Sequence, residues 1–281
     1  MSTSSPPRDP KVTTLVPGGR FQGFDWRELI EYRDLLYFMV RRDIRSRYAQ
    51  SILGLGWAVI RPLLTVVIFT VVFGTLADID GDGMPYPLFS NLGVVPWTYF
   101  AAALAAAANS LVGNALVSKV YFPRIIIPLA PVFSNLLDFV IAFVLLIPPM
   151  MLYYGYSPHW TAIFLPFLVV LMMMTATGLG IWLAALAVQY RDVKFALTFL
   201  VSTMMYIAPV AWPASEIPER YRILYGFYPM AGVIEGFRAL LLGATPIPYD
   251  LLIPGTISSL VLLITGALYF SHRQGIYADV H

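Results

Sequence analysis

Cysteine is absent from the chain, so disulfides and thiolate metal sites are excluded, and cysteine usage gives no information about the redox compartment. Charge is scarce, because Asp, Glu, Lys and Arg make up 12% of the 281 residues, about half their share in a soluble domain. A phosphate-binding loop of the form G-x-x-x-x-G-K-[ST] is also missing, so the chain does not bind ATP by that motif. No internal repeat and no matching pair of interrupted apolar segments is found, which disfavours a transporter built from inverted halves.

Clusters of catalytic or metal-binding residues are missing as well. The three histidines, His159, His272 and His281, are scattered over loop and tail positions, so no metal site is expected. A membrane enzyme that transfers sugars or acyl groups would need acid–base residues gathered at one interface, and the sequence offers none. The N-terminal residues have no apolar signal-peptide core, and we expect 1–25 to form a disordered cytoplasmic tail.

Hydrophobic residues dominate the chain, at 58% of the sequence with a mean hydropathy of +0.72. Six apolar stretches are long enough, or nearly so, to cross about 30 Å of hydrocarbon. They lie at 60–77, 93–113, 127–154, 161–188, 195–212 and 251–271. We therefore predict an all-α polytopic membrane protein with six transmembrane helices, in which residues 49–281 form the membrane domain.

The positions of the positive charges predict the orientation. With the N-terminus inside, the inner segments hold fifteen of the eighteen cations and leave Arg220, Arg222 and Arg238 outside. The inner cations are Arg8, Lys11, Arg20, Arg27, Arg33, Arg41, Arg42, Arg45, Arg47, Arg61, Lys119, Arg124, Arg191, Lys194 and Arg273. Because cytoplasmic segments carry the excess of Lys and Arg, both termini are expected in the cytoplasm.

Residues 26–48 are predicted to form an amphipathic interface helix followed by a basic gate region. In "WRELIEYRDLLYFMV", 26–40, the apolar residues Trp26, Leu29, Ile30, Leu36, Tyr37 and Val40 follow a helical period, and the charges fall on the other side. The alternative is a helix packed on a soluble subdomain. The basic run that follows consists of Arg41, Arg42, Arg45 and Arg47. Gly54 and Gly56 would ease a bend before the first span, and Trp57 would anchor that bend at the interface.

Residues 213–249 are predicted to hold two short helices that re-enter the outer leaflet, because a helix at 230–242 is only about 20 Å long. Glu235 and Arg238 are three residues apart and fall on one face, where they can pair. The alternative is a helix lying on the outer surface. Asp138 is the only carboxylate well inside a span, and no span offers it a cation. It is interpreted as a hydrogen-bonded or protonated group near Ser134 and Asn135, or else as a polar residue of a transport path.

Five motifs in order resemble the permease subunit of type 2 ABC exporters, and most closely the polysaccharide exporters of the O-antigen, capsule and teichoic acid group. They read "EYRDLLYFMVRRDIRSRYAQSILGLGWAVIRPLL", "VSKVYFPRIIIPLAPVFSNLLDF", "VQYRDVKF", "YPMAGVIEGFRALLLG" and "YADV". The match runs from about Leu29 to Val280. It departs from the family at Tyr228, where Asn usually precedes the proline, and at His281, where the family commonly has an apolar residue.

The resemblance implies a homodimer around a central pore in the bacterial inner membrane, with two separate ATPase subunits below. ATP and magnesium would then belong to the partner subunits, and this chain would need no cofactor. The implied cargo is a long glycan on a polyprenyl diphosphate lipid, moved from the cytoplasmic to the outer side. Membrane lipids are the other expected partners, and nucleic acid is not expected.

Four sets of candidate residues follow. For coupling to the ATPase they are Arg33, Asp34, Lys119, Tyr121, Phe122 and Arg124, the last four in a loop that is alternatively a turn lying among headgroups. For a gate that collects the lipid diphosphate they are Arg41, Arg42, Arg45, Arg47, Gly54, Gly56 and Trp57, where the alternative for each arginine is ordinary anchoring. For stacking on sugars along the glycan path they are Phe69, Phe73, Phe195, Phe199 and Tyr206, which are alternatively lipid-facing or core aromatics. The outer gate would use Tyr228, Glu235 and Arg238.

Other functions remain as alternatives. The first is a type 2 ABC permease for a small hydrophobic compound or drug, and the others are a passive channel or scramblase and a membrane enzyme.

Overall fold

The computed structural model describes residues 30–49, 51–112 and 122–273, and within these ranges all regular structure is helical. The α-helices are α2 (Arg33–Tyr48), α3 (Trp57–Phe69), α4 (Tyr86–Asn109), α6 (Ile126–Tyr153), α7 (Leu165–Gln189), α8 (Asp192–Ile207), α9 (Glu219–Gly226), α10 (Pro229–Leu242) and α11 (Tyr249–Arg273). Short helices of other types are η1 (Gly54–Gly56), the π-helix η2 (Thr70–Leu76), η3 (Trp160–Phe164) and η4 (Ala214–Glu216).

Five helical segments in the described ranges are long and apolar enough to cross a membrane, so the chain is an integral membrane protein. They are Gly54–Leu76, Tyr86–Asn109, Ile126–Tyr153, Trp160–Gln189 and Tyr249–His272. Five of the six predicted spans are thereby found. The second begins earlier than predicted, because Ser90 and Asn91 are polar by sequence but buried inside the bundle. There the Ser90 hydroxyl donates to the Pro87 carbonyl, and the Asn91 amide donates to the sulfur of Met150.

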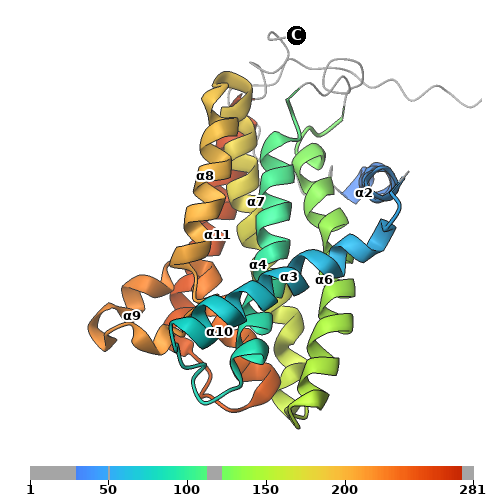
Figure 1. Ribbon diagram of the computed structural model, residues 1–281. Coiled ribbons are helices and arrows are strands. Elements are labelled where there is room, and N and C mark those ends of the chain that lie inside the picture. Colours follow the sequence, from blue (N-terminus) through green and yellow to red (C-terminus); the bar gives the residue numbers. More distant parts are fainter. Residues whose placement is uncertain (1–29, 50, 113–121, 274–281) are drawn as a thin grey trace, which may run out of the picture.

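Helix α4 forms the centre of the bundle and packs on α6 and α7 (Figure 1). In its most apolar stretch 78% of the residues are buried, against 11% for Gly54–Leu76. Small side chains allow this central position, because an alanine such as Ala107 lets a neighbouring helix approach closely. A Cβ on Gly180 of α7 would come within 2.7 Å of the Ala107 methyl.

Helices α7 and α11 approach each other even more closely. A Cβ on Gly178 would lie 2.7 Å from the backbone nitrogen of Leu263, and one on Gly266 would lie 2.7 Å from the Gly178 carbonyl oxygen. The hydroxyls of Thr175 and Ser259 share a buried hydrogen bond of 2.8 Å across the same contact. Glycine and a small polar pair therefore bring the two backbones together, as is common between helices in membranes.

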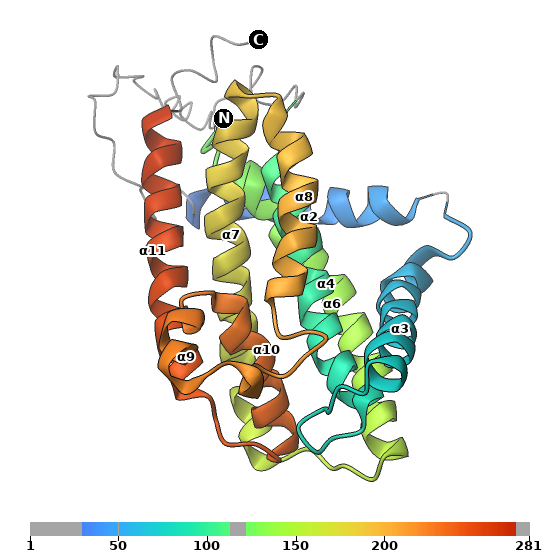
Figure 2. The same ribbon diagram turned by 60° about the vertical axis from the view of Figure 1, so that its left-hand side comes forward.

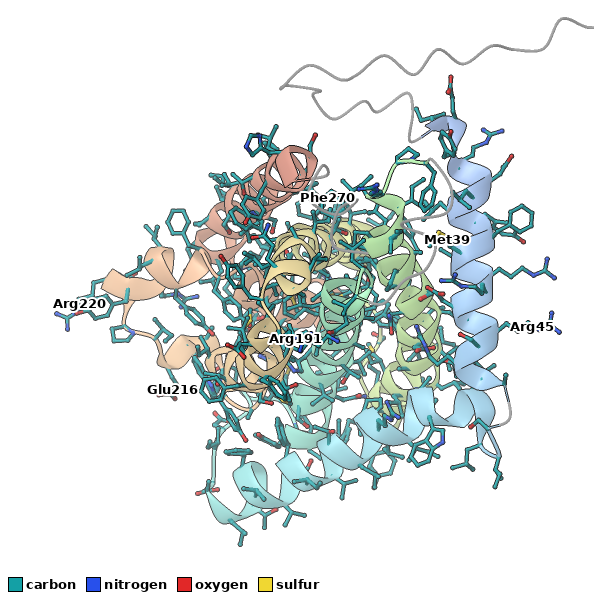
Figure 3. All side chains as sticks on the ribbon, turned by 90° about the horizontal axis from the view of Figure 1, so that it is seen from above. Met39, Arg45, Arg191, Glu216, Arg220 and Phe270 are labelled. Atoms are coloured by element: carbon teal, nitrogen blue, oxygen red, sulfur yellow. The ribbon has the colours of Figure 1, made fainter. Side chains whose placement is uncertain are left out.

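Helix α2 lies along the outer side of the bundle and packs on α6 (Figure 3). It continues to Tyr48, so the prediction that the amphipathic helix ends at 40 is wrong: arginine is a good helix former, and the basic run stays helical. The predicted apolar face is also split. Leu36 and Val40 pack inward beside buried Met39, whereas Ile30 and Tyr37 are 64% and 61% exposed. Trp26 and Leu29 lie outside the described residues.

The chain changes direction between α2 and α3, and we call residues 51–56, which lead into α3, the elbow (Figure 2). Gly54 has φ +48°, a left-handed conformation that favours glycine. Gly56 has an ordinary helical φ of −58°. The bend therefore needs a glycine only at position 54.

Helix α8 has only 16 residues, about 24 Å, and it is not among the five segments long enough to span. The expected fifth span 195–212 is interrupted after Ile207, because Ala208 precedes Pro209 and the residue before a proline is disfavoured in the helical region. Ala208 accordingly has an extended backbone, with ψ 146°.

Two short helices occupy the predicted 213–249 segment. The expected helix at 230–242 is present as α10, which begins with Pro229 in its first turn and ends at Gly243, where φ is +64°. All its residues are buried. Helix α9 precedes it and is largely exposed, and both lie at the end of the bundle opposite α2 (Figures 1 and 2).

Candidate functional site

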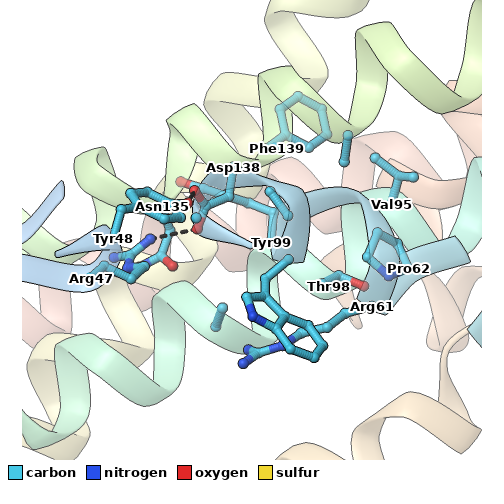
Figure 4. Close-up of a pocket in the computed structure, with 15 residues that line it drawn as sticks. Arg47, Tyr48, Arg61, Pro62, Val95, Thr98, Tyr99, Asn135, Asp138 and Phe139 are labelled. Atoms are coloured by element: carbon cyan, nitrogen blue, oxygen red, sulfur yellow. Dashed lines mark hydrogen bonds and ion pairs between the residues drawn. The ribbon is translucent and has the colours of Figure 1, made fainter. Parts of the chain in front are cut away.

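A cavity of about 210 Å³ lies behind the elbow (Figure 4). Its walls come from the end of α2, the elbow, α3, α4 and α6. The polar residues that line it include Arg47, Tyr48, Arg61, Thr98 and Asp138. We call it the elbow cavity, because it opens beside the turn that separates the interface helix from the first apolar segment.

Asp138 stands at one side of the elbow cavity, about three turns into α6. Its Oδ2 accepts a hydrogen bond from Arg47 Nη1 at 2.6 Å, and its Oδ1 accepts one from the Tyr48 hydroxyl. Arg47 Nη2 also donates to the Ser134 hydroxyl at 3.0 Å. We call these four residues the Asp138 cluster. The expectation that Asp138 is a hydrogen-bonded group near Ser134 is met, and its cationic partner comes from α2 rather than from a span.

A second arginine faces the same cavity from α3. The guanidinium of Arg61 lies over the Trp57 ring, 5.6 Å from its centroid. At this separation the face of the aromatic ring attracts the cation. The cavity lining therefore holds two arginines and one carboxylate, an excess of one positive charge. An anion with two negative charges would find hydrogen-bond donors from Arg47 and Arg61 around this space.

The other arginines of the basic run do not line the elbow cavity. Arg42 donates to Asp43, its neighbour in sequence, at 2.9 Å. Arg45 points away from the bundle (Figure 3), and Arg41 is exposed. Of the four arginines predicted to form a diphosphate gate, the structure brings only Arg47 to the cavity.

The residues predicted to couple to an ATPase are only partly described. Arg33 and Asp34 are exposed near the start of α2 and lie 3.9 Å apart. Phe122 is 7% exposed and packs in the cluster that contains Met39. Arg124 is partly buried, whereas Lys119 and Tyr121 lie outside the described residues. Phe122 therefore contributes here to the packing between α2 and the bundle.

The aromatic residues predicted to contact a glycan divide into two groups. On α8, Phe195, Phe199 and Tyr206 are 80%, 74% and 71% exposed and share one face. Phe69 and Phe73 are partly buried and contact each other edge to face, with ring centroids 5.3 Å apart. The α8 aromatics thus form an uncovered apolar face, whereas the other two pack against the core.

A buried ion pair lies at the opposite end of the bundle. The expected pairing of Glu235 with Arg238 is present: Arg238 Nη1 donates to Glu235 Oε1 at 2.9 Å, and the Arg238 side chain has no exposed surface. Arg238 also donates to the Phe89 and Val210 carbonyls, and Glu235 accepts from the Ala214 amide at 2.9 Å. The pair therefore joins α10 to α4 and to the segment that follows α8.

Gly93 restricts the geometry of this pair, and Tyr228, the third predicted outer-gate residue, binds α8 nearby. A Cβ on Gly93 of α4 would lie 2.9 Å from Arg238 Nη2, so a side chain at position 93 would displace the guanidinium. The Tyr228 hydroxyl donates to the Met204 carbonyl of α8 at 3.1 Å. These contacts make the predicted outer-gate residues a buried joint between α10, α4 and α8.

No metal site is formed by the part of the chain that the structure describes, since no three His, Cys, Asp or Glu residues come together there. His159 instead caps η3, where its ring nitrogen accepts from the Thr161 amide. Sequence reasoning missed the roles of Tyr48 and Arg61 in the elbow cavity. The available signal was Asp138, because a carboxylate at membrane depth needs a partner.

Comparisons with known proteins give a consistent result. The sequence profile described as ABC-2 type transporter matches residues 34–242. The O-antigen export system permease protein RfbA of Myxococcus xanthus is 27% identical over 257 residues, which cover 90% of this chain and 97% of that protein. RfbA of Klebsiella pneumoniae is 25% identical over 249 residues, with coverages of 88% and 95%. The polysialic acid transport protein KpsM of Escherichia coli is 21% identical over 198 residues, with coverages of 69% and 76%.

Proposed function

The chain belongs to the ABC-2 type transporter family, and from this premise we propose that it is the membrane subunit of an ATP-driven polysaccharide exporter. The cargo in this proposal is a glycan on a polyprenyl diphosphate lipid of O-antigen, capsule or teichoic acid type. One observation carries the proposal: the similarity to O-antigen export permeases extends over 90% of this chain and 97% of the relative. Similarity over both full lengths supports the same architecture and not merely a shared segment.

Six membrane crossings are part of the proposal. Helix α8 is short, but it runs beside α7 from the α7–α8 turn toward the end that holds α10, and α11 returns from that end (Figures 1 and 2). Helix α8 and the residues after it would thus make the fifth crossing, and α9 and α10 would be the re-entrant pair. The complete burial of α10 favours re-entry over a helix lying on the outer surface.

The cytoplasmic side of the inner membrane is assigned to the end that holds α2. That end carries Arg41, Arg42 and Arg45, whereas Asp78, Asp80 and Asp82 lie in the connection at the other end. This asymmetry agrees with the positive-inside rule and supports cytoplasmic termini.

A homodimer and two ATPase subunits complete the proposed exporter. The exposed apolar residues of α3, such as Leu64 and Ile68, and the aromatic face of α8 provide the surface for a second copy and for the glycan path. ATP and magnesium would bind in the ATPase subunits. Their dock would include the exposed start of α2 and residues 118–124, of which 118–121 lie outside the described residues.

The lipid diphosphate would be collected by the basic run and the elbow. Cations at headgroup depth attract phosphate by about 1 kcal/mol each, and a diphosphate carries more charge than a common phospholipid. Arg47 and Arg61 line the elbow cavity, and Gly54 provides the bend beside it. The glycan would pass along the α8 aromatics toward the joint formed by Glu235 and Arg238.

Depletion of the chain in its native cell tests this proposal. We expect lipid-linked glycan to accumulate on the cytoplasmic side while surface polysaccharide falls, and we expect an ATPase to copurify with the tagged chain. An unchanged glycan distribution together with retention of a small hydrophobic compound would favour the drug permease instead. Flux without ATP and without an ATPase would favour a passive channel or scramblase.

A further inference from the structure

The Asp138 cluster joins the last turn of α2 to the middle of α6. Both carboxylate oxygens are engaged, one by Arg47 at 2.6 Å and the other by the Tyr48 hydroxyl. The side chains of Arg47 and Asp138 are 30% and 25% exposed, so the ion pair is partly removed from solvent. A carboxylate at this depth is costly without a partner, and the cluster therefore holds the end of α2 against α6.

The elbow begins directly after this attachment. Residues 51–53 form no regular helix, and Gly54 takes a left-handed φ of +48° before η1 leads into α3. Six of the thirteen residues of α3 are exposed, and the helix packs on α4 and α6 through the others. The attachment at Arg47 and Tyr48 borders the elbow cavity, so its release would let the start of the elbow move away from α6.

The Arg47 guanidinium has five N–H groups, and it donates one from each terminal nitrogen, to the Asp138 carboxylate and to the Ser134 hydroxyl. A phosphate in the elbow cavity would need the same guanidinium, since paired N–H groups match phosphate oxygens as well as they match a carboxylate. Arg61 faces the cavity and stacks on Trp57, with no carboxylate partner in the described ranges. It offers the first contact to such an anion.

We propose that Asp138 is a displaceable internal anion. Its carboxylate holds Arg47 and keeps the elbow closed, and a phosphate group arriving at Arg61 takes its place on Arg47 and releases the elbow from α6. Asp138 is then a positioning residue, and it sets how tightly an anionic headgroup must bind Arg47 before the elbow is released. The inference rests on the proposed function for the identity of the cargo, but the competition between carboxylate and phosphate is a property of this chain alone.

The absence of native cysteine allows a direct test. An Ala58→Cys variant of the full chain places a single thiol at the cavity wall. Its labelling is measured in phosphatidylcholine nanodiscs with two methanethiosulfonates, one carrying a sulfonate and the other a trimethylammonium. The comparison covers the parent, Asp138→Asn, Arg47→Gln and the control Arg191→Gln, which removes one exposed charge from the turn between α7 and α8.

The two variants should affect the opening of the elbow in the same way and the binding of an anion in opposite ways. Asp138→Asn and Arg47→Gln should both speed labelling at least about threefold, because each breaks the attachment, and Arg191→Gln should label like the parent. In Asp138→Asn the sulfonate reagent should gain most, and inorganic pyrophosphate should protect the thiol at about tenfold lower concentration, the affinity ratio of roughly one hydrogen bond to a charged group. In Arg47→Gln protection by pyrophosphate should weaken.

Three results would overturn the proposal: unchanged labelling in both variants, the same pyrophosphate dependence in both, or no protection by either phosphate source. The two sources are inorganic pyrophosphate in solution and phosphatidic acid in the nanodisc, and the one that protects identifies whether a free or a lipid-borne phosphate is bound. If Asp138→Asn does not purify, the exchange of Arg47→Asp with Asp138→Arg takes its place. Slow labelling in the exchange variant supports the attachment, and fast labelling refutes it. None of these outcomes alters the depletion experiment, so the two proposals fail separately.

Discussion

Replacement of Arg238 by methionine tests the buried joint that Glu235 and Arg238 form at the end of the bundle opposite α2. The Arg238 side chain has no exposed surface, and that of Glu235 is 10% exposed. Arg238→Met keeps most of the side-chain volume but leaves the Glu235 carboxylate buried, with the Ala214 amide as its remaining hydrogen-bond donor. It also leaves the Phe89 and Val210 carbonyls without their guanidinium donor.

The expected loss is large, because removal of one partner from a buried ion pair costs about 3–5 kcal/mol. Such a loss lowers a melting temperature by on the order of 10 °C. The measurement is the heat stability of the purified chain in nanodiscs, followed by the loss of its monodisperse elution after heating. Because unfolding of such a protein is commonly irreversible, the comparison is made at one heating time.

The double variant Glu235→Leu with Arg238→Met provides the control. Replacement of a whole buried pair by apolar residues is often neutral or stabilising, so the double variant should recover most of the stability lost in Arg238→Met. If the temperature that halves the monodisperse fraction falls by less than about 3 °C in the single variant, the charge is not the strong buried group that the structure indicates. If the double variant is as unstable as the single one, the joint depends on packing and not on charge compensation.

The remaining predictions concern the α7–α11 contact, the elbow and the basic run. Gly178→Val should separate α7 from α11 and abolish the folded protein, since even a Cβ there would lie 2.7 Å from the α11 backbone; monodisperse purification of this variant would contradict the close contact. Gly54→Ala should destabilise the elbow by about 1 kcal/mol, whereas Gly56→Ala should cost less, because only Gly54 has a positive φ; thermal stability and export assays distinguish the two. Arg47→Gln should reduce polysaccharide export more than Arg45→Gln, because only Arg47 lines the elbow cavity; equal surface polysaccharide in both variants would argue against a special role for the cavity.

Local signals were sufficient for several elements. Pro229 and Gly243 predicted the bounds of α10, since a proline begins a helix without losing a hydrogen bond and a glycine ends one with a positive φ. The spacing of Glu235 and Arg238 predicted their pairing, because residues three apart meet on one helix face. Apolar length predicted five of the spans.

Long-range contacts account for the differences from prediction. The partner of Asp138 is Arg47, 91 positions earlier in the chain, and no local pattern joins the two. Ser90 and Asn91 lowered the hydropathy of the second span although both are buried by neighbouring helices. The predicted interface helix ends at residue 40 because the periodic apolar residues end there. Helix α2 continues to Tyr48, whose hydroxyl contacts Asp138 of α6. Pro209 indicated that α8 ends before it, but the residues after Pro209 are also apolar, so the predicted span was extended to 212.

Reconstitution tests the central claim most directly. The chain and the ATPase that copurifies with it are placed in proteoliposomes that carry a lipid-linked glycan on the ATPase side, and a lectin on the opposite side records arrival of the sugar. The account predicts lectin binding that requires ATP and is lost when the ATPase is omitted. Glycan that arrives at the same rate without ATP, or never arrives while ATP is hydrolysed, would contradict it.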